Sequence, residues 1–202
     1  MENTLPRLIV ASNNKNKLRE FDAILGHLYQ VVSMRDAGVD ADIEEDGVTF
    51  EDNALIKANY VMQVTGCAAI ADDSGLTVDA LDDEPGVYSA RYAVMNGEGE
   101  GDKDNNNLLL RRMKGKTRRQ CAFQCAIALA RPGEETLIAE GSCPGVLLEE
   151  ERGTGGFGYD PLFLYEPLNK TFAEVNEEEK NAVSHRARAC EKMLEIMKEI
   201  NA

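Results

Sequence analysis

The pattern of apolar and polar residues predicts a chain in which strands and helices alternate. Residues 8–11 form a short apolar run typical of a buried strand, and the polar turn Ser12-Asn13-Asn14 follows it. A helix is predicted next, because apolar residues recur at helical spacing at Leu18, Phe21, Leu25 and Leu28. Residues 31–33 are predicted as a further short strand.

A second helix and a central strand follow. Thr49 with Asp52 three residues later is a capping-box pattern, so a helix is predicted from there to Gly66. The continuous apolar run 67–71 predicts a strand that is buried on both faces. We expect this strand to end at Asp72-Asp73-Ser74-Gly75 and a separate strand to cover residues 76–81.

The second half of the chain also mixes strands and helices. Residues 95–107 are expected to form a flexible loop or the approach to a helix, and a glycine-rich loop and a C-terminal helix beginning at Ser184 are expected near the end. Other predicted elements are a short helix over 108–113, strands over 119–130 and 136–142 with a Pro132-Gly133 hairpin between them, and a loop over 153–161. The pattern predicts an α/β protein with a mixed sheet.

Composition narrows the classes of function. The 202 residues include 22 basic and 36 acidic side chains, for a net charge of −14, which disfavours binding to nucleic acid polymers and to anionic membranes. No apolar run reaches the roughly 20 residues of a membrane helix. The odd number of five cysteines favours free thiols in a reducing cytoplasm, and the absence of CxxC makes a zinc site a weak alternative.

The first candidate site is the segment Ser12, Asn13, Asn14, Lys15, Asn16, Lys17. Lys15 and Lys17 lie where a strand turns into a helix, although the helix dipole disfavours cations there. Lysines beside free backbone N–H groups form an anion site, for which phosphate is the common occupant. The alternative is a solvated helix start that is capped by asparagine.

The second candidate site is Asp72-Asp73 after the buried strand. Adjacent carboxylates at a strand end are typical of a Mg²⁺ site or a general base, and Glu44-Glu45-Asp46 is a candidate source of another ligand. The alternative is a tight Asp-Ser-Gly turn. Asn53 and Lys57 are four residues apart on a predicted helix, so they share a face and can reach one ligand.

The third candidate site combines a basic helix start with aromatic residues. His185 and Arg186 follow the serine cap Ser184, and Phe157 and Tyr159 lie in the glycine-rich loop, where an aromatic ring can stack on a planar base. The alternative for the basic cluster is a surface ion pair with the acidic residues 177–179. Together, the three segments indicate a site for a metal-bound nucleotide.

Six motifs in order give a specific family resemblance over nearly the whole chain. They are SNNKNK at 12–17, EEDGVTFEDNALIKA at 44–58, AIADDSGL at 69–76, PGVYSARYA at 85–93, GTGGFGYDPLF at 153–163 and EEKNAVSHRARA at 178–189. The sequence thereby resembles the inosine triphosphate pyrophosphatase family, whose members hydrolyse non-canonical purine nucleoside triphosphates such as dITP, ITP and XTP.

The resemblance implies a single domain over residues 1–202 with a long, mixed, twisted sheet, flanking helices and a central cleft between two lobes. It also implies a homodimer, a requirement for Mg²⁺, and the products nucleoside monophosphate and pyrophosphate. By the same resemblance, Ser12 to Lys17 hold the phosphates, Glu45 and Asp73 bind the metal, and Ser74 contacts substrate. The implied nucleobase pocket consists of Phe157, Gly158, Tyr159, Asp160, Lys180, His185 and Arg186.

The residue types then give an expected mechanism and its rivals. Asp73, or a metal-bound water that it orients, attacks the α-phosphorus, and Lys17 and Lys57 stabilise the departing pyrophosphate. His185 and Arg186 as donors favour the O6 acceptor of hypoxanthine and reject the amino group of adenine. The alternatives are a pyrophosphatase for other modified nucleotides and a non-catalytic nucleotide sensor, which would not need the carboxylates.

Overall fold

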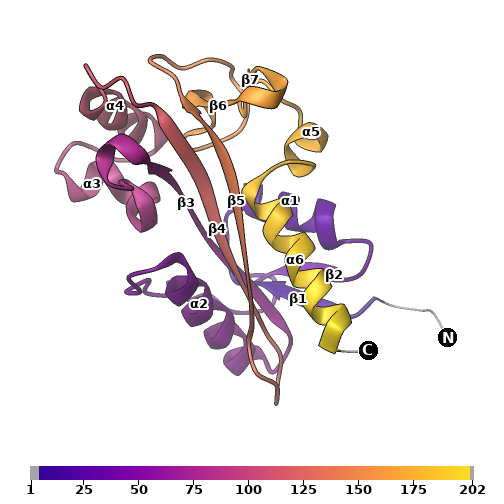
Figure 1. The fold of residues 1–202 in the computed structure, drawn as a ribbon. Coiled ribbons are helices and arrows are strands. Elements are labelled where there is room, and N and C mark those ends of the chain that lie inside the picture. Colours follow the sequence, from indigo (N-terminus) through magenta and orange to yellow (C-terminus); the bar gives the residue numbers. More distant parts are fainter. Residues whose placement is uncertain (1–4, 201–202) are drawn as a thin grey trace. The chain divides into compact units, whose positions relative to one another are not determined.

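The computed structural model describes residues 5–200, and within them it contains a mixed seven-stranded sheet flanked by helices (Figure 1). The order of strands is β2-β1-β3-β4-β5-β6-β7, in which β1 runs parallel to β2 and β3, while β6 is antiparallel to β5 and β7. The strands are β1 (Arg7–Val10), β2 (Gln30–Ser33), β3 (Ala69–Val78), β4 (Gln120–Ala130), β5 (Leu137–Leu147), β6 (Phe163–Tyr165) and β7 (Lys170–Thr171). The predicted α/β class with a mixed sheet is confirmed.

The helices begin and end largely where their sequence signals predicted. They are α1 (Lys15–Leu25), α2 (Phe50–Thr65), α3 (Tyr92–Met95), α4 (Asp102–Arg112), α5 (Glu177–Asn181) and α6 (His185–Ile200). The capping box of Thr49 and Asp52 is formed at the start of α2. Gly66 ends α2 with a φ of 65°, a left-handed conformation that glycine adopts without steric cost.

The chain divides into two compact units. Unit 1 comprises Met1–Asp73, Cys125–Gly141 and Arg186–Ala202, and unit 2 comprises Ser74–Gln124 and Ser142–His185. The strands β3, β4 and β5 contribute residues to both units. The assignment of residues 1–202 to a single domain with two lobes and a cleft stays a prediction.

Unit 1 places a different core on each face of its strands. Leu8 and Val10 of β1 belong to a cluster with residues of α1 and α6, while the intervening Ile9 belongs to a second cluster with residues of α2. This division follows from the period of two along a strand, which sends successive side chains to opposite faces. The fully buried residues that helix α2 contributes to its cluster are Ala54, Ala58 and Val61.

Unit 2 has a more aromatic core. The rings of Phe123, Phe163 and Phe172 lie within 4.6–5.8 Å of one another, centroid to centroid. Helix α4 packs against this cluster through Leu108 and Leu109. These contacts fix β6, which follows the glycine-rich loop in the chain, against β4 and α4.

The prediction for the segment around Asp72 is wrong, and two other predictions about local structure are refined. The strand predicted to end before Asp72 continues through it to Val78, so neither a turn at Asp72-Asp73-Ser74-Gly75 nor a separate strand over 76–81 exists. Of the two alternatives for residues 95–107, a flexible loop or the approach to a helix, the structure supports the second, since this tract leads into α4 and is helical from Asp102 onward. The strand predicted over 136–142 extends to Leu147, because partners on β4 and β6 satisfy its backbone beyond the predicted end.

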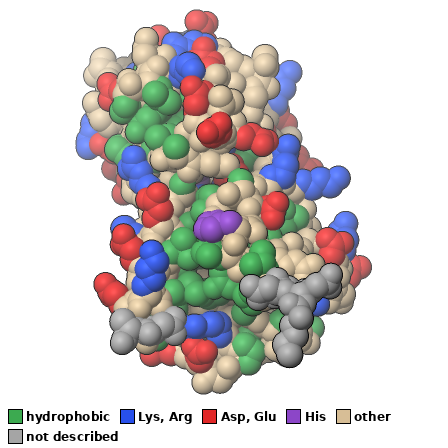
Figure 2. Space-filling view, turned by 90° about the vertical axis from the view of Figure 1, so that its right-hand side faces the viewer, with side chains coloured by type: hydrophobic (Ala, Val, Ile, Leu, Met, Phe, Trp, Pro, Cys, Tyr) green, Lys and Arg blue, Asp and Glu red, His purple; other side chains and the backbone are tan. Residues whose placement is uncertain are grey.

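The charge and cysteine predictions are tested in part. On the face drawn in Figure 2, acidic side chains lie among basic and apolar ones rather than in one continuous patch. All five cysteines are free thiols. Among residues 5–200, no helix is both long enough and apolar enough to cross a membrane.

Candidate active site

The two adjacent carboxylates lie in the middle of β3 rather than at its end. Asp72 and Asp73 are both buried, with 3% and 6% of their surfaces exposed. Their side chains leave the strand in opposite directions, as successive residues of a strand do. The strand continues through this polar sequence because cationic and amide side chains of unit 1 meet both carboxylates, so no turn toward solvent is needed.

Asp73 meets the polar face of α2. Nδ2 of Asn53 donates a hydrogen bond to Oδ2 of Asp73 over 2.9 Å, and Nζ of Lys57 lies 3.7 Å from Oδ1. The same Lys57 ammonium lies 3.2 Å from Oε1 of Glu45. The predicted common face of Asn53 and Lys57 is therefore confirmed, and it brings Glu45 and Asp73 to one cation.

Asn53 also holds the acidic segment in place. Its Oδ1 accepts a hydrogen bond from the backbone N–H of Gly47 over 2.9 Å, which fixes the orientation of the amide. A Cβ at position 47 would lie only 2.6 Å from that oxygen, so this close approach requires glycine. Through this contact, the segment that contains Glu45 is anchored beside α2.

The pKa of Asp73 is raised above its ordinary value. Burial is the main cause, and the neighbouring carboxylate of Glu45 adds to it, while Lys57 acts in the opposite direction. A carboxylate whose pKa is raised toward neutrality is a better proton acceptor than an exposed one.

Asp72 belongs to a second ionic cluster, between α1 and α6. Nε and Nη2 of Arg186 donate to Oδ2 of Asp72 over 3.1 and 2.6 Å, and Nη1 donates to Glu20. Nζ of Lys17 lies 3.1 Å from Oδ1 of Asp72. Burial alone would raise the pKa of Asp72, but the charges of Arg186 and Lys17 hold it well below its ordinary value.

This arrangement differs from the sequence-based expectations for Arg186. The expectation that Arg186 lies on the surface, paired with residues 177–179, is wrong, because only 1% of this residue is exposed and its guanidinium binds the buried carboxylates of Asp72 and Glu20. We also expected the guanidinium to face a nucleobase, whereas three of its nitrogens, Nε, Nη1 and Nη2, bind carboxylates of unit 1. Sequence alone could not show these partners, because they lie on distant segments.

The start of α1 combines a cap with lysines. Oδ1 of Asn14 accepts hydrogen bonds from the backbone N–H groups of Asn16 and Lys17, so the expected asparagine cap is formed. Asn13 and Lys15 are exposed, and Ser12 accepts a hydrogen bond from the N–H of Asn14 over 3.1 Å. No acidic residue occupies the first turn, so this helix end keeps its positive character.

Unit 2 contains a compact cluster around the glycine-rich loop, which we call the base-side cluster: Phe157, Gly158, Tyr159, Asp160 and Lys180. Nζ of Lys180 donates to Oδ2 of Asp160 over 2.7 Å and lies 4.5 Å from the centroid of the Phe157 ring. The same carboxylate oxygen accepts the N–H of Phe157 over 2.9 Å. Gly156, with a φ of 70°, permits this close loop, since a Cβ there would lie 2.2 Å from Asp160.

The aromatic residues of this unit have unequal exposure. Tyr159 is buried and donates its hydroxyl to the backbone oxygen of Ser89 over 2.8 Å, so it is a core residue, whereas Phe157 is half-buried. His185 is buried, and its ring stacks on Phe123 at 4.9 Å with an angle of 17° between the planes. Ser74 is half-buried in β3.

Glu45 and Asp73 are the candidate metal ligands of unit 1. Among residues 5–200, no group of three or more histidine, cysteine, aspartate or glutamate side chains is placed to hold a metal ion. Glu45 and Asp73 supply carboxylate oxygens around one ammonium group, and carboxylate oxygen is the donor that Mg²⁺ prefers. Since Mg²⁺ in nucleotide sites takes one or two carboxylates plus substrate phosphates, the residues fit such an ion.

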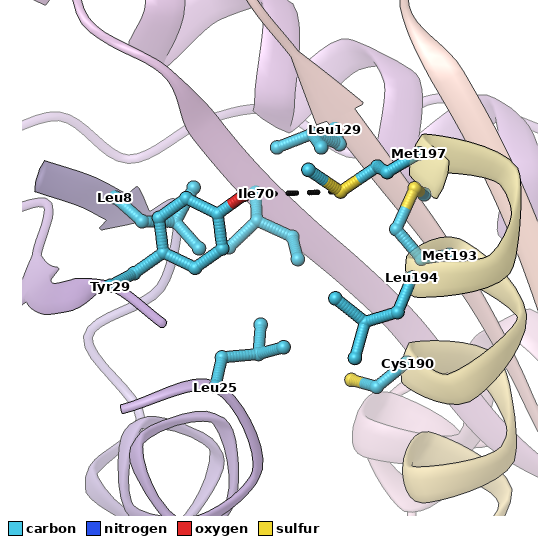
Figure 3. A pocket seen from close by; sticks show the side chains of 9 residues that line it. All are labelled: Leu8, Leu25, Tyr29, Ile70, Leu129, Cys190, Met193, Leu194 and Met197. Atoms are coloured by element: carbon cyan, nitrogen blue, oxygen red, sulfur yellow. Dashed lines mark hydrogen bonds between the residues drawn. The ribbon is translucent and has the colours of Figure 1, made fainter. Parts of the chain in front are cut away.

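A small cavity in unit 1 has no charged side chain in its lining. Its volume is about 10 Å³, enough for at most about one water molecule (Figure 3). Its lining is largely aliphatic and sulfur-bearing: Leu8, Leu25, Tyr29, Ile70, Leu129, Cys190, Met193, Leu194 and Met197. The cavity is a gap in core packing beneath α6, and it is too small for a nucleotide.

Sequence reasoning missed three polar residues at these sites. Glu20 binds Arg186, and its spacing of three from Lys17 on one helix was the available signal. Asp102 and Asn106 hydrogen-bond to Gly158, but their tract was expected to be a flexible loop or the approach to a helix, with no role at the site. Only the fold brings that helix to the glycine-rich loop.

Comparison with known proteins places the chain in a family. Residues 8–196 match the Ham1 family, and the chain belongs to that family. It is 47% identical over 196 residues to a dITP/XTP pyrophosphatase of Bacillus licheniformis, covering 96% of this chain and 98% of the relative. The identity is 50% over 188 residues to a dITP/XTP pyrophosphatase of Geobacter sulfurreducens, covering 92% and 93%. A solved HAM1 protein from Coxiella burnetii superposes with a TM-score of 0.85 at 38% identity, covering 96% and 100%.

Proposed function

We propose that this protein hydrolyses non-canonical purine nucleoside triphosphates, dITP, ITP and XTP, to the monophosphate and pyrophosphate. The names of the relatives from Bacillus licheniformis and Geobacter sulfurreducens support the substrate class. The observation that carries the proposal is the convergence of Glu45 and Asp73 on Lys57 in unit 1. That group offers acid–base, metal-binding and phosphate-binding chemistry within a few ångströms.

Unit 1 is proposed to bind the triphosphate. The segment Ser12 to Lys17 presents the positive end of α1, and Lys17 and Lys57 provide ammonium groups that compensate phosphate charge. Both lysines already bind carboxylates, which holds their side chains in place before substrate arrives. Such preorganised cations stabilise the charge that develops on a departing pyrophosphate.

Glu45 and Asp73 would hold Mg²⁺. When bound, this ion neutralises negative charge on phosphate oxygens. Lys57 contacts the same two carboxylates and keeps them close together without the ion. Because carboxylates repel one another, a shared cation of this kind is needed to preserve the pair.

Asp73 is proposed to accept the proton of the attacking water. Asn53 donates to Oδ2 and Lys57 lies nearer Oδ1, so the carboxylate has a fixed orientation. The water attacks the α-phosphorus, its proton passes to Asp73, and the bond from the α-phosphorus to the bridging oxygen breaks. Pyrophosphate leaves with that oxygen, and the monophosphate keeps the new one.

Unit 2 is proposed to bind the purine base. The half-buried Phe157 offers a ring for stacking, and the Lys180 ammonium is a donor for O6 of hypoxanthine or xanthine. Adenine has a donor at that position, which leaves two donors facing each other. His185 adds a second donor in this unit, and Ser74 is proposed as a further substrate contact.

Arg186 is proposed to act through Asp72 and Glu20 rather than by reading the base. Its buried guanidinium ties α6 to α1 and β3. Lys17 meets the same Asp72, so the ion cluster fixes the position of a phosphate-binding lysine.

We further propose a homodimer that works in the cytoplasm, as the family resemblance implies.

Product analysis tests this function. The protein is incubated with ITP, dITP, XTP, GTP, ATP and a modified pyrimidine triphosphate, each with and without Mg²⁺, and pyrophosphate and orthophosphate are measured separately. We expect pyrophosphate and monophosphate in equal amounts, fastest for the first three substrates and only with Mg²⁺. Release of orthophosphate would contradict the proposed bond cleavage, and preference for the pyrimidine would favour the alternative substrate class.

A further inference from the structure

The tract 95–107, which no proposed role uses, leads into a helix that meets the base-side cluster. Helix α4 begins at Asp102, and Asn106 lies one turn later on the same face. Leu108 and Leu109 of this helix are buried in the core of unit 2. The helix is therefore a fixed support rather than part of a flexible loop.

Both backbone polar groups of Gly158 are bound by α4. Its N–H donates to Oδ2 of Asp102 over 2.7 Å, and its carbonyl oxygen accepts from Nδ2 of Asn106 at 3.2 Å. Nδ2 of Asn106 also donates to Oε1 of Glu151 at 2.8 Å, which fixes the orientation of this amide. One helix thus holds a single glycine from both sides.

Gly158 occupies the centre of the loop that carries the base-side cluster. Its φ is 60°, a left-handed conformation that favours glycine. The preceding Phe157 binds Asp160 through its N–H, and Lys180 contacts both of these residues. A rotation of the Gly158 peptide would therefore displace the aromatic ring and change the position of the ammonium group.

The burial of Asn106 in this position has an unfavourable energetic contribution. Only 3% of its surface is exposed, and its Oδ1 has no hydrogen-bond partner. A buried acceptor without a partner is unfavourable, so a smaller apolar residue would be tolerated here if packing were the only requirement. The bonds of Nδ2 to Gly158 and Glu151 explain why an amide occupies this position.

We propose that Asp102 and Asn106 are positioning residues for recognition of the purine base. They hold Gly158 so that Phe157 and Lys180 face a planar base with an oxygen acceptor at position 6. This inference rests on the proposed function, because it assigns the base to unit 2. It adds a specificity role for a tract outside the family motifs quoted above.

The test compares Asn106→Ala and Asp102→Ala with the wild type. For each, kcat and KM are measured with ITP and ATP, and exchange of the Gly158 amide hydrogen is followed by NMR. We expect KM for ITP to rise about tenfold while kcat changes by no more than about twofold, so the ITP-to-ATP ratio of kcat/KM should fall about tenfold. The amide hydrogen of Gly158 should exchange faster than in the wild type. Asp102→Asn keeps an oxygen acceptor and should restore most of the ratio.

Asn107→Ala is the matched control, because Asn107 is exposed on the same helix. The inference is overturned if the ratio is unchanged in a folded Asp102→Ala variant, or if Asn107→Ala lowers it equally. Asp102 is exposed, so its variant keeps the test decisive should Asn106→Ala fail to fold. A wild type that releases no pyrophosphate from ITP would instead refute the proposed function, and the inference with it.

Discussion

The Arg186–Asp72 pair of unit 1 and the Lys180–Asp160 pair of unit 2 are both buried, yet their surroundings differ. Asp72 meets two cations, and its neighbour Asp73 meets a third, Lys57. The carboxylate of Asp160 meets Lys180 and a backbone N–H, and aromatic rings surround the ammonium. Unit 1 therefore suits a ligand of high charge, such as a metal-bound triphosphate, whereas unit 2 suits a planar and nearly neutral one.

The largest effect is expected at Asp73, where the chemistry of unit 1 is concentrated. Asp73→Asn removes the proposed proton acceptor, which is also a proposed metal ligand, while keeping the shape of the side chain, so kcat should fall on the order of 10²–10⁴-fold. Steady-state kinetics with ITP and Mg²⁺ measure this loss. Asp82→Asn makes the same change at an exposed residue and should leave kcat unaltered.

Thermal unfolding of both variants shows whether the fold is preserved. A folded Asp73→Asn variant that turns over at nearly the wild-type rate would remove Asp73 from the mechanism. It would also remove the main reason for assigning catalysis to unit 1.

The ion cluster of Arg186 should affect stability more than base choice. Arg186→Met leaves Asp72 and Glu20 buried without their guanidinium partner, which should lower the free energy of unfolding by about 3–5 kcal/mol. Denaturant titration measures this free energy. The control is Arg118→Ala, which breaks an exposed ion pair with Asp79 and should lower the free energy of unfolding by only about 0–1 kcal/mol. If Arg186 reads the base instead, the ITP-to-ATP ratio of kcat/KM will fall in protein that remains folded.

Sequence patterns predicted the elements better than they predicted the partners of charged residues. The strand at 8–11 and the capped helix at Thr49 were correct because their signals are local: an apolar run and a side-chain cap. The continuation of β3 through Asp72 and Asp73 was not predicted, because two adjacent carboxylates are unfavourable in a buried strand unless cations pair with them. Here the cations are Lys57 and Arg186, which lie on segments distant in the sequence. The roles of the candidate site residues stay predictions that kinetics must test.

A smaller effect is expected from the cation of unit 2. Lys180→Met keeps the length of the side chain but removes the proposed donor for O6, whose charge-assisted hydrogen bond would contribute about 1.5–3 kcal/mol. The ITP-to-ATP ratio of kcat/KM should fall by roughly 10–150-fold, mainly through poorer use of ITP. Lys170→Ala, which breaks an exposed pair with Glu179, should not change the ratio.

The proposed assignment of phosphate binding to unit 1 and base recognition to unit 2 is tested most directly by measuring Lys17→Ala and Lys180→Met in parallel. For each variant, kcat/KM is measured with ITP and with ATP at one concentration of Mg²⁺. Lys17 is proposed to contact phosphates, which both nucleotides share, so Lys17→Ala should lower both values by roughly 10–150-fold and leave their ratio unchanged. Lys180→Met should lower the ratio itself. Equal changes of the ratio in the two variants would contradict the assignment of phosphate binding to unit 1 and base recognition to unit 2.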